Sequence, residues 1–326
     1  MFEKKISRRT MLRNSGLALL GSSLAGTISS CTSKKYQPES GSMPTAKRPF
    51  RISMNVSTIR GFKLGVEKQI DLIAEAGFEG IELWVSDVEA YLKEGGTPEA
   101  LARQMQDAGL QLENMISFST WIAEDETRRR EGQKKMREDM ELTARLGGKY
   151  IAAPVQGIRT IERDKLPLYS DHFRQILESG DETGVTPILE LWGAAALNQL
   201  SDTAAITIGT GHPKATMLLD FYHLYRGGNS FESLRQLNGA MFPIFHINDY
   251  PNQPIRSELN DSDRVFPGDG ICPFHEVLPI LYQTGFRGTL SVELFNKSYW
   301  ETMDAKTILR KSYEKTLEVI HHSLDI

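Results

Sequence analysis

The stretch Ala215-Thr-Met-Leu-Leu-Asp-Phe-Tyr-His-Leu-Tyr-Arg226 is a short apolar run that ends in Asp220, with His223 three residues further on. An apolar run of this length that ends in a carboxylate, with Gly227-Gly228 soon after it, is typical of a buried parallel strand. Such a strand delivers one charged group to the edge of a sheet. Because an unpaired buried carboxylate costs free energy, we expect Asp220 to face a cation or hydrogen-bond donors.

Three other short apolar runs end in a polar residue in the same way. They are Pro187-Ile-Leu-Glu190, Phe242-Pro-Ile-Phe-His246 and Leu290-Ser-Val-Glu293. Side chains alternate along a strand, so the polar residue that ends each run shares a face with the residue two positions earlier. In a barrel, these strand ends converge on one pocket. Taken alone, each residue is more often a helix cap or a loop anchor, and His223 alone fits a structural histidine.

Four such ends in succession predict a metal centre at the mouth of a barrel. The predicted ligands are Glu190, Asp220, His246 and Glu293. Three carboxylates and one imidazole suit a divalent cation, with Mn2+, Mg2+ or Co2+ favoured and Zn2+ also compatible.

Outward from these runs, strand and helix patterns alternate along the chain from Phe50. Strands are expected over residues 51–57, 80–85, 111–117, 149–155 and 186–191, and then in the runs that end at Asp220, His246 and Glu293. Helices are expected over residues 66–76, 97–109, 127–146, 169–183 and 305–323. Repeated strand-helix units without a break in composition predict a single-domain α/β fold, the (β/α)8 TIM barrel. A doubly wound open sheet is the alternative, but no Gly-rich dinucleotide fingerprint follows the first strand.

The composition of the chain limits the classes of function that it can have. The chain has 326 residues, of which 40% are hydrophobic and 25% charged, and this is enough to bury a large core. A net charge of -4 gives no electrostatic case for binding nucleic acid or an anionic membrane surface. The two cysteines are Cys31 and Cys272. Since Cys31 lies in the expected leader, the mature domain is expected to form no internal disulfide.

The first residues have the pattern of an export signal. Ser7-Arg8-Arg9-Thr10-Met11-Leu12-Arg13 resembles a twin-arginine export signal, and Ile28-Ser29-Ser30-Cys31 resembles a lipobox. The alternative is an ordinary signal peptide cleaved near Ser30. We therefore expect a signal over residues 1–31, a flexible linker over 32–49 and the barrel over 50–326. The expected product is a periplasmic lipoprotein exported by the twin-arginine route, which contacts the membrane only through its lipid anchor.

Several stretches together carry a resemblance to a known family. They are Gly77-Phe-Glu-Gly-Ile-Glu-Leu83, Ile188-Leu-Glu190, Leu219-Asp-Phe-Tyr-His223, Phe245-His-Ile-Asn-Asp249, Pro267-Gly-Asp-Gly270 and Val292-Glu293. The chain from about Phe50 resembles the xylose isomerase-like TIM barrels, which include ketose 3-epimerases, inosose dehydratases, hydroxypyruvate isomerases and endonuclease IV. The resemblance implies that the four predicted ligands hold a metal, that His223 and Arg264 bind substrate, and that Glu190 and Glu293 also transfer protons.

Four further side chains have two open interpretations. Trp84, Trp121 and Trp192 follow strands at the same predicted mouth, where they either form an apolar wall for a sugar ring or pack in the core. Among them Trp192 is the candidate substrate-binding residue. Glu82 is either a polar group of the pocket or a structural residue.

The predicted function is a divalent-metal-dependent sugar isomerase or epimerase that works through an enediolate. The export signal and the lack of a Gly-rich phosphate loop favour an unphosphorylated ketose or keto-glycoside as substrate. A dehydratase or lyase with the same metal and base is the alternative, and a non-catalytic sugar-binding lipoprotein is a weaker one. A repair nuclease needs more strand-end histidines and a basic groove. The pattern leaves open the sugar, the metal and the oligomeric state.

Overall fold

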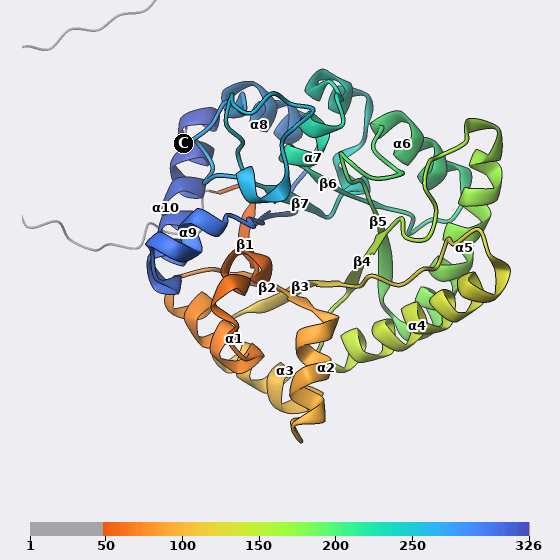
Figure 1. Ribbon diagram of the computed structural model, residues 1–326, viewed down its shortest axis with the longest axis horizontal. Coiled ribbons are helices and arrows are strands. Elements are labelled where there is room, and N and C mark those ends of the chain that lie inside the picture. Colours follow the sequence, from red (N-terminus) through yellow and green to blue (C-terminus); the bar gives the residue numbers. More distant parts are fainter. Residues whose placement is uncertain (1–47, 326) are drawn as a thin grey trace, which may run out of the picture. The chain divides into compact units, whose positions relative to one another are not determined.

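Eight parallel strands close into a barrel in chain order, and helices surround it (Figure 1). The computed structural model describes residues 48–325. The strands are β1 (Arg51–Asn55), β2 (Gly80–Trp84), β3 (Gln111–Ile116), β4 (Tyr150–Pro154), β5 (Thr186–Glu190), β6 (Met217–Asp220), β7 (Ile244–Ile247) and β8 (Thr289–Val292). The predicted (β/α)8 barrel is confirmed, and the open doubly wound sheet is excluded because β1 pairs with β8. The predicted leader (1–31) and most of the predicted linker (32–49) lie outside the described residues.

The helices vary widely in length. They are α1 (Val66–Glu75), α2 (Val85–Lys93), α3 (Pro98–Asp107), α4 (Glu126–Arg145), α5 (Leu166–Thr183), α6 (Leu200–Gly209), α7 (Phe221–Arg226), α8 (Phe274–Gln283), α9 (Lys297–Thr302) and α10 (Ala305–Leu324). Short 3-10 helices are η2 (Val56–Phe62), η3 (Arg163–Lys165), η4 (Phe231–Gln236), η5 (Gly239–Met241) and η6 (Asp261–Asp263). Within residues 48–325, none of the helices combines the length and the apolarity that crossing a bilayer requires.

The predicted helices correspond to α1, α3, α4, α5 and α10. Helix α3 begins as expected, because the Thr97 side chain accepts a hydrogen bond from the Ala100 amide and Pro98 occupies the first turn. Gly109 follows it with a φ of +72°, which favours glycine. Helices α7 and α9 have only six residues each, too few for a helical period to show in the sequence. Helix α8 contains Pro279, which a sequence pattern treats as a break.

The barrel interior has an apolar side and a polar side. One cluster of inward-facing side chains consists of Ile116, Ala152, Ile188, Leu218 and Ile244, from β3 to β7. The expected alternation is therefore confirmed, since three of these residues lie two positions before a strand-end polar residue. Buried polar side chains from β1, β2, β3 and β8 fill the other side, among them Ser53, Glu82, Asn114 and Ser291. The C-terminal strand ends carry the candidate site above both halves.

Candidate functional site

Four strand-end side chains meet around one ring nitrogen at the mouth of the barrel. Glu190 and Asp220 end β5 and β6, His246 lies near the end of β7, and Glu293 directly follows β8. The nearest carboxylate oxygens lie 3.2 Å from Nδ1 of His246 in Glu293, 3.8 Å in Asp220 and 4.0 Å in Glu190. All four side chains are buried. The strand-end pattern thus identified residues that the fold brings together.

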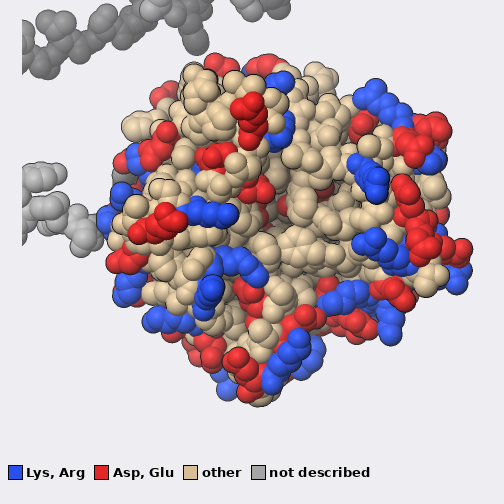
Figure 2. Space-filling view, in the orientation of Figure 1, with Lys and Arg blue, Asp and Glu red and all other residues tan. Residues whose placement is uncertain are grey.

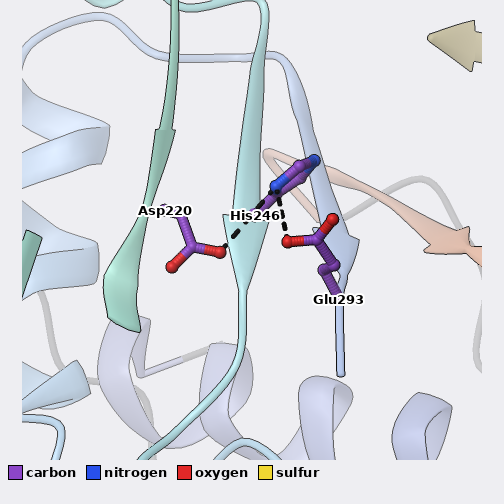
Figure 3. A group of neighbouring side chains, drawn as sticks. All are labelled: Asp220, His246 and Glu293. Atoms are coloured by element: carbon purple, nitrogen blue, oxygen red, sulfur yellow. Dashed lines mark ion pairs between the residues drawn. The ribbon is translucent and has the colours of Figure 1, made fainter. Parts of the chain in front are cut away.

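Three of the four residues form the tightest group. Asp220, His246 and Glu293 each offer a ligand atom, and these atoms lie within 4.8 Å of one another (Figure 3). Glu190 lies outside this group and lines the pocket, and its Oε2 has no hydrogen-bond partner among the described residues. The predicted set of four is therefore a compact set of three with one adjacent glutamate.

The donor set fits a divalent cation. Burying carboxylates side by side is costly unless a cation compensates their charge. Both Nδ1 of His246 and Oε2 of Glu190 are buried without a hydrogen-bond partner in the described part of the chain. Carboxylate oxygens and one imidazole nitrogen are ligands that Mn2+, Co2+ and Zn2+ accept.

The two glutamates have contrasting environments. Burial raises the pKa of Glu190 to about 8, and the nearby Glu293 carboxylate adds to this rise. Burial acts on Glu293 as well, but His246 and Arg264 outweigh it and hold the pKa of Glu293 well below its usual value. Oε1 of Glu293 also accepts a hydrogen bond of 3.1 Å from Asn55 Nδ2. Glu293 is therefore a fixed, ionised carboxylate, whereas Glu190 retains a proton near neutral pH.

Arg264 is a buried guanidinium that joins the metal-site carboxylates to His223. Its Nη1 donates to Oε2 of Glu293 at 2.8 Å and to Oδ2 of Asp220 at 3.2 Å. Its Nη2 lies 3.0 Å from Nε2 of His223 and donates to Asp261 at 2.6 Å. Since arginine only donates, Nε2 of His223 accepts and Nδ1 carries the hydrogen. Burial and the nearby guanidinium hold the pKa of His223 well below its usual value, so the ring is neutral.

Asp249 shapes the long connection between β7 and α8 that carries Arg264. Its carboxylate accepts hydrogen bonds from four backbone amides, those of Tyr250 (2.8 Å), Gly268 (3.0 Å), Gly270 (2.9 Å) and Cys272 (2.9 Å). Its backbone forms an antiparallel bridge with Val265. A Cβ on Gly270 would collide with the Tyr250 carbonyl oxygen. The Pro-Gly-Asp-Gly stretch is therefore a turn that holds the connection over the mouth.

Glu82 lies under His246 inside the barrel. One carboxylate oxygen is 3.2 Å from Nε2 of His246, and the same oxygen accepts a hydrogen bond of 2.7 Å from Asn114 Nδ2. Of the two open interpretations, the structure shows Glu82 inside the barrel and in contact with a site residue, although it does not line the pocket. Asn55 and Asn114 were not identified from the sequence. Asn55 ends β1 and obeys the same strand-end rule as the predicted ligands, which is the signal that would have found it.

A pocket of about 180 Å3 opens above the strand ends. Its polar side consists of Glu190, His223, Asp261, Arg264 and Glu293, and its apolar side consists of Trp84, Ile116, Phe118, Trp192 and Phe295. Figure 2 shows a hollow near the middle of this face with acidic residues inside it. Phe118 is 44% exposed, and its ring centroid lies 4.9 Å from that of Trp84 and 6.0 Å from that of Trp192.

The three tryptophans divide between the two interpretations. Trp84 and Trp192 line the pocket, and Trp192 stacks on His223 with ring centroids 6.3 Å apart. Trp121 does not: it is fully buried, and its indole N–H donates to the Pro154 carbonyl at 3.0 Å. A wall made of all three is therefore wrong. Phe118, which the sequence reasoning missed, occupies the place between the other two.

Comparisons with known proteins agree with this architecture. The family model for xylose isomerase-like TIM barrels matches residues 70–319. An inosose isomerase of Bacillus velezensis is 28% identical over 262 residues, which cover 78% of this chain and 91% of that protein. A 3-dehydroshikimate dehydratase of Pseudomonas putida is 23% identical over 71% of this chain and 36% of its own length. The crystal structure of the IOLI protein with a bound zinc atom superposes with a TM-score of 0.77 at 24% identity, covering 85% of this chain and all of that one.

Proposed function

This chain belongs to the family of xylose isomerase-like TIM barrels, and from that premise we propose that it is a divalent-metal-dependent isomerase or epimerase of an unphosphorylated ketose or keto-glycoside. The observation that carries the proposal is the asymmetric pair of glutamates around His246. Glu190 lines the pocket, and its Oε2 has no hydrogen-bond partner among the described residues, whereas Glu293 is fixed and ionised. Proton transfer next to a carbonyl group requires such a pair within reach of one substrate.

Glu190, Asp220, His246 and Glu293 are the residues that would hold the cation. When bound, the cation polarises the substrate carbonyl and stabilises the enediolate charge. Mn2+, Mg2+ or Co2+ suits this oxygen-rich set, and Zn2+ is compatible with it. The contacts from Arg264 to Asp220 and Glu293 keep these two carboxylates oriented toward the same point.

Glu190 and Glu293 are proposed to move the proton. The unpartnered Oε2 of Glu190 lets its carboxyl group exchange a proton with a substrate carbon or oxygen without first breaking a protein hydrogen bond. Glu293 is held by Asn55 and Arg264, so it acts from a fixed position as the ionised member of the pair. Transfer from one to the other face of the carbon gives epimerisation, and transfer between neighbouring carbons gives isomerisation.

The remaining pocket residues would orient the sugar. His223 has no hydrogen-bond partner at Nδ1 among the described residues, so this N–H is available to a substrate oxygen. Trp192 stacks on the same ring and, with Phe118 and Trp84, gives the apolar side against which one face of a sugar ring can pack. Arg264 makes four hydrogen bonds to protein side chains, so we assign it to positioning and to charge near the substrate.

A dehydratase is the second candidate. Its support is the 3-dehydroshikimate dehydratase among the relatives together with a Glu190 carboxyl group that keeps its proton near neutral pH. Such a group can protonate a departing hydroxyl after a proton has been taken from the neighbouring carbon. The same residues serve both reactions, and the position of the leaving group in the substrate decides between them.

The test combines metal analysis with substrate profiling. The purified protein should contain about one divalent ion per chain. It should then be incubated in deuterated water with an inosose, an unphosphorylated ketose, a 3-keto-glucoside and 3-dehydroshikimate, and followed by NMR. Exchange of the proton next to the carbonyl with all oxygens retained supports the isomerase or epimerase, and loss of water supports the dehydratase. A metal-loaded protein that exchanges no proton in any of these compounds would refute the proposal.

Export to the periplasm is also a proposal. It rests on the twin-arginine-like stretch around Arg8 and Arg9 and on the lipobox-like stretch that ends in Cys31. These residues lie outside the described part of the chain. If the proposal is correct, the barrel works on the outer side of the inner membrane, where unphosphorylated sugars and glycosides are the available substrates.

A further inference from the structure

Glu82 is a fully buried carboxylate whose ion-pair partner, within residues 48–325, is a histidine. Its carboxylate oxygens lie 3.2 Å from Nε2 of His246. Strands β2 and β7 are not neighbours in the closed sheet, so the two side chains meet across the barrel interior. Asn114, from the neighbouring strand β3, donates to the same carboxylate at 2.7 Å and fixes its orientation.

A second buried glutamate shows what a structural carboxylate looks like in this barrel. Glu113 on β3 is also almost completely buried, but Arg51 pairs with it through two hydrogen bonds of 3.0 Å and 2.9 Å. A permanent cation offsets part of the cost of burying that charge, which amounts to several kcal/mol per ion, although burial still raises the pKa of Glu113. Within the described residues, the partners of Glu82 are instead the His246 imidazole and the Asn114 amide. Its position therefore suggests a role at the site in addition to a role in folding.

The geometry defines that role through the two nitrogens of one ring. Both oxygens of the Glu82 side chain lie 3.2 Å from Nε2 of His246 and act as acceptors, so this contact places a hydrogen on Nε2. Nδ1, on the other side of the ring, faces the metal-site carboxylates, with Oε2 of Glu293 3.2 Å away, and is the nitrogen left to bind a cation once it has given up its hydrogen. Nδ1 itself has no hydrogen-bond partner among the described residues. The contact with Glu82 on one side of the ring thus orients Nδ1, on the other side, for binding a cation.

We propose that Glu82 is a positioning residue for the metal centre: it accepts the Nε2 hydrogen of His246, fixes the ring and directs Nδ1 to the cation. Asn114 extends this support by one further hydrogen bond. Carboxylate partners of metal-binding histidines fix the tautomer and raise the basicity of the coordinating nitrogen, and their loss commonly weakens metal binding 10- to 100-fold. The inference rests on the proposed metal centre.

The experiment measures Zn2+ affinity by competition with a chromophoric chelator. Glu82→Ala removes the acceptor and should weaken Zn2+ binding by about 10- to 100-fold. Glu82→Gln retains an acceptor oxygen but loses the charge, so its affinity should lie between those of Glu82→Ala and the wild type. The matched control is Glu113→Gln, which removes a buried carboxylate from the same barrel interior without touching a site residue. It should lower the free energy of unfolding and leave Zn2+ affinity within about twofold of the wild type.

NMR of the His246 ring distinguishes a positioning role from a purely structural one, because the ring signal should not change if Glu82 only supports folding. In the Zn2+-loaded protein with 15N-labelled histidine, the Nε2–H signal of His246 should appear downfield because it donates to a carboxylate. This signal should move upfield in Glu82→Gln. If Glu82→Ala does not fold, Glu82→Gln alone is sufficient for both measurements. Unchanged affinity and an unchanged signal in Glu82→Gln would overturn the role of Glu82, as would an equal loss of affinity in Glu113→Gln. A wild-type protein that binds no Zn2+ would instead overturn the metal centre itself and this inference with it.

Discussion

Replacing Glu190 by glutamine tests whether this residue transfers the substrate proton. Glutamine keeps the shape and one ligand oxygen, and Oε2 of Glu190 has no hydrogen bond to lose. If Glu190 exchanges the substrate proton, turnover should fall by about 100-fold or more, the scale of general acid-base catalysis. This corresponds to roughly 2.7 kcal/mol in the activation barrier. The assay is deuterium exchange into the best substrate of the panel, with the bound metal measured in the same sample.

The same substitution has an opposite effect on stability, and its sign follows from the pKa. In the folded metal-free protein Glu190 keeps its proton up to a pKa of about 8, whereas the unfolded chain releases it above about 4.5. The folded state therefore binds more protons between these pH values, and the free energy of unfolding falls as the pH rises through this window. The full fall is on the order of 5 kcal/mol. Glu190→Gln does not titrate, so this part of the decline should disappear.

Urea unfolding at pH 5, 6.5 and 8 in the presence of a chelator measures that decline. Glu113→Gln is again the control, since it removes a buried carboxylate away from the pocket and should keep normal turnover. Two results would refute the reasoning about Glu190. One is near-normal turnover in a metal-loaded Glu190→Gln variant. The other is a decline in stability with pH that is as steep in the variant as in the wild type.

Three further changes test other parts of the site and the leader. His223→Ala should raise KM about tenfold and change kcat less, because it removes one substrate hydrogen bond; equal losses in both would argue for a role in the transition state. Asp249→Ala should lower the free energy of unfolding by about 3 kcal/mol in urea, since four backbone amides lose their acceptor, and an unchanged midpoint would contradict this. Changing Arg8 and Arg9 together to lysine should keep the protein in the cytoplasm. Cys31→Ala should release it from the membrane fraction, and persistent membrane attachment would exclude the lipid anchor.

The sequence by itself was sufficient for the fold class and for the strand-end residues. Short apolar runs that end in a polar residue predict parallel strands, because a strand that is buried on both faces needs apolar residues at nearly every position. The fold then brings these ends to one mouth, so Glu190, Asp220, His246 and Glu293 were identified together. Short helices such as α7 escaped, because six residues contain no readable period.

Only the tertiary structure decided what each of these residues faces. Asp220 and Glu293 form a compact group with His246, whereas Glu190 lies beside this group. Glu293 is held in place by Arg264 and Asn55, which come from distant parts of the chain. Trp121 and Trp192 look alike as residues that follow strands, yet one packs in the core and the other lines the pocket.

The contact between Glu82 and His246 has the same origin, since 164 residues separate its two partners. A local pattern records which face of a strand a side chain takes, because alternation is a property of neighbouring residues. It does not record which side chains meet across a closed barrel, because that depends on the curvature and stagger of all eight strands together.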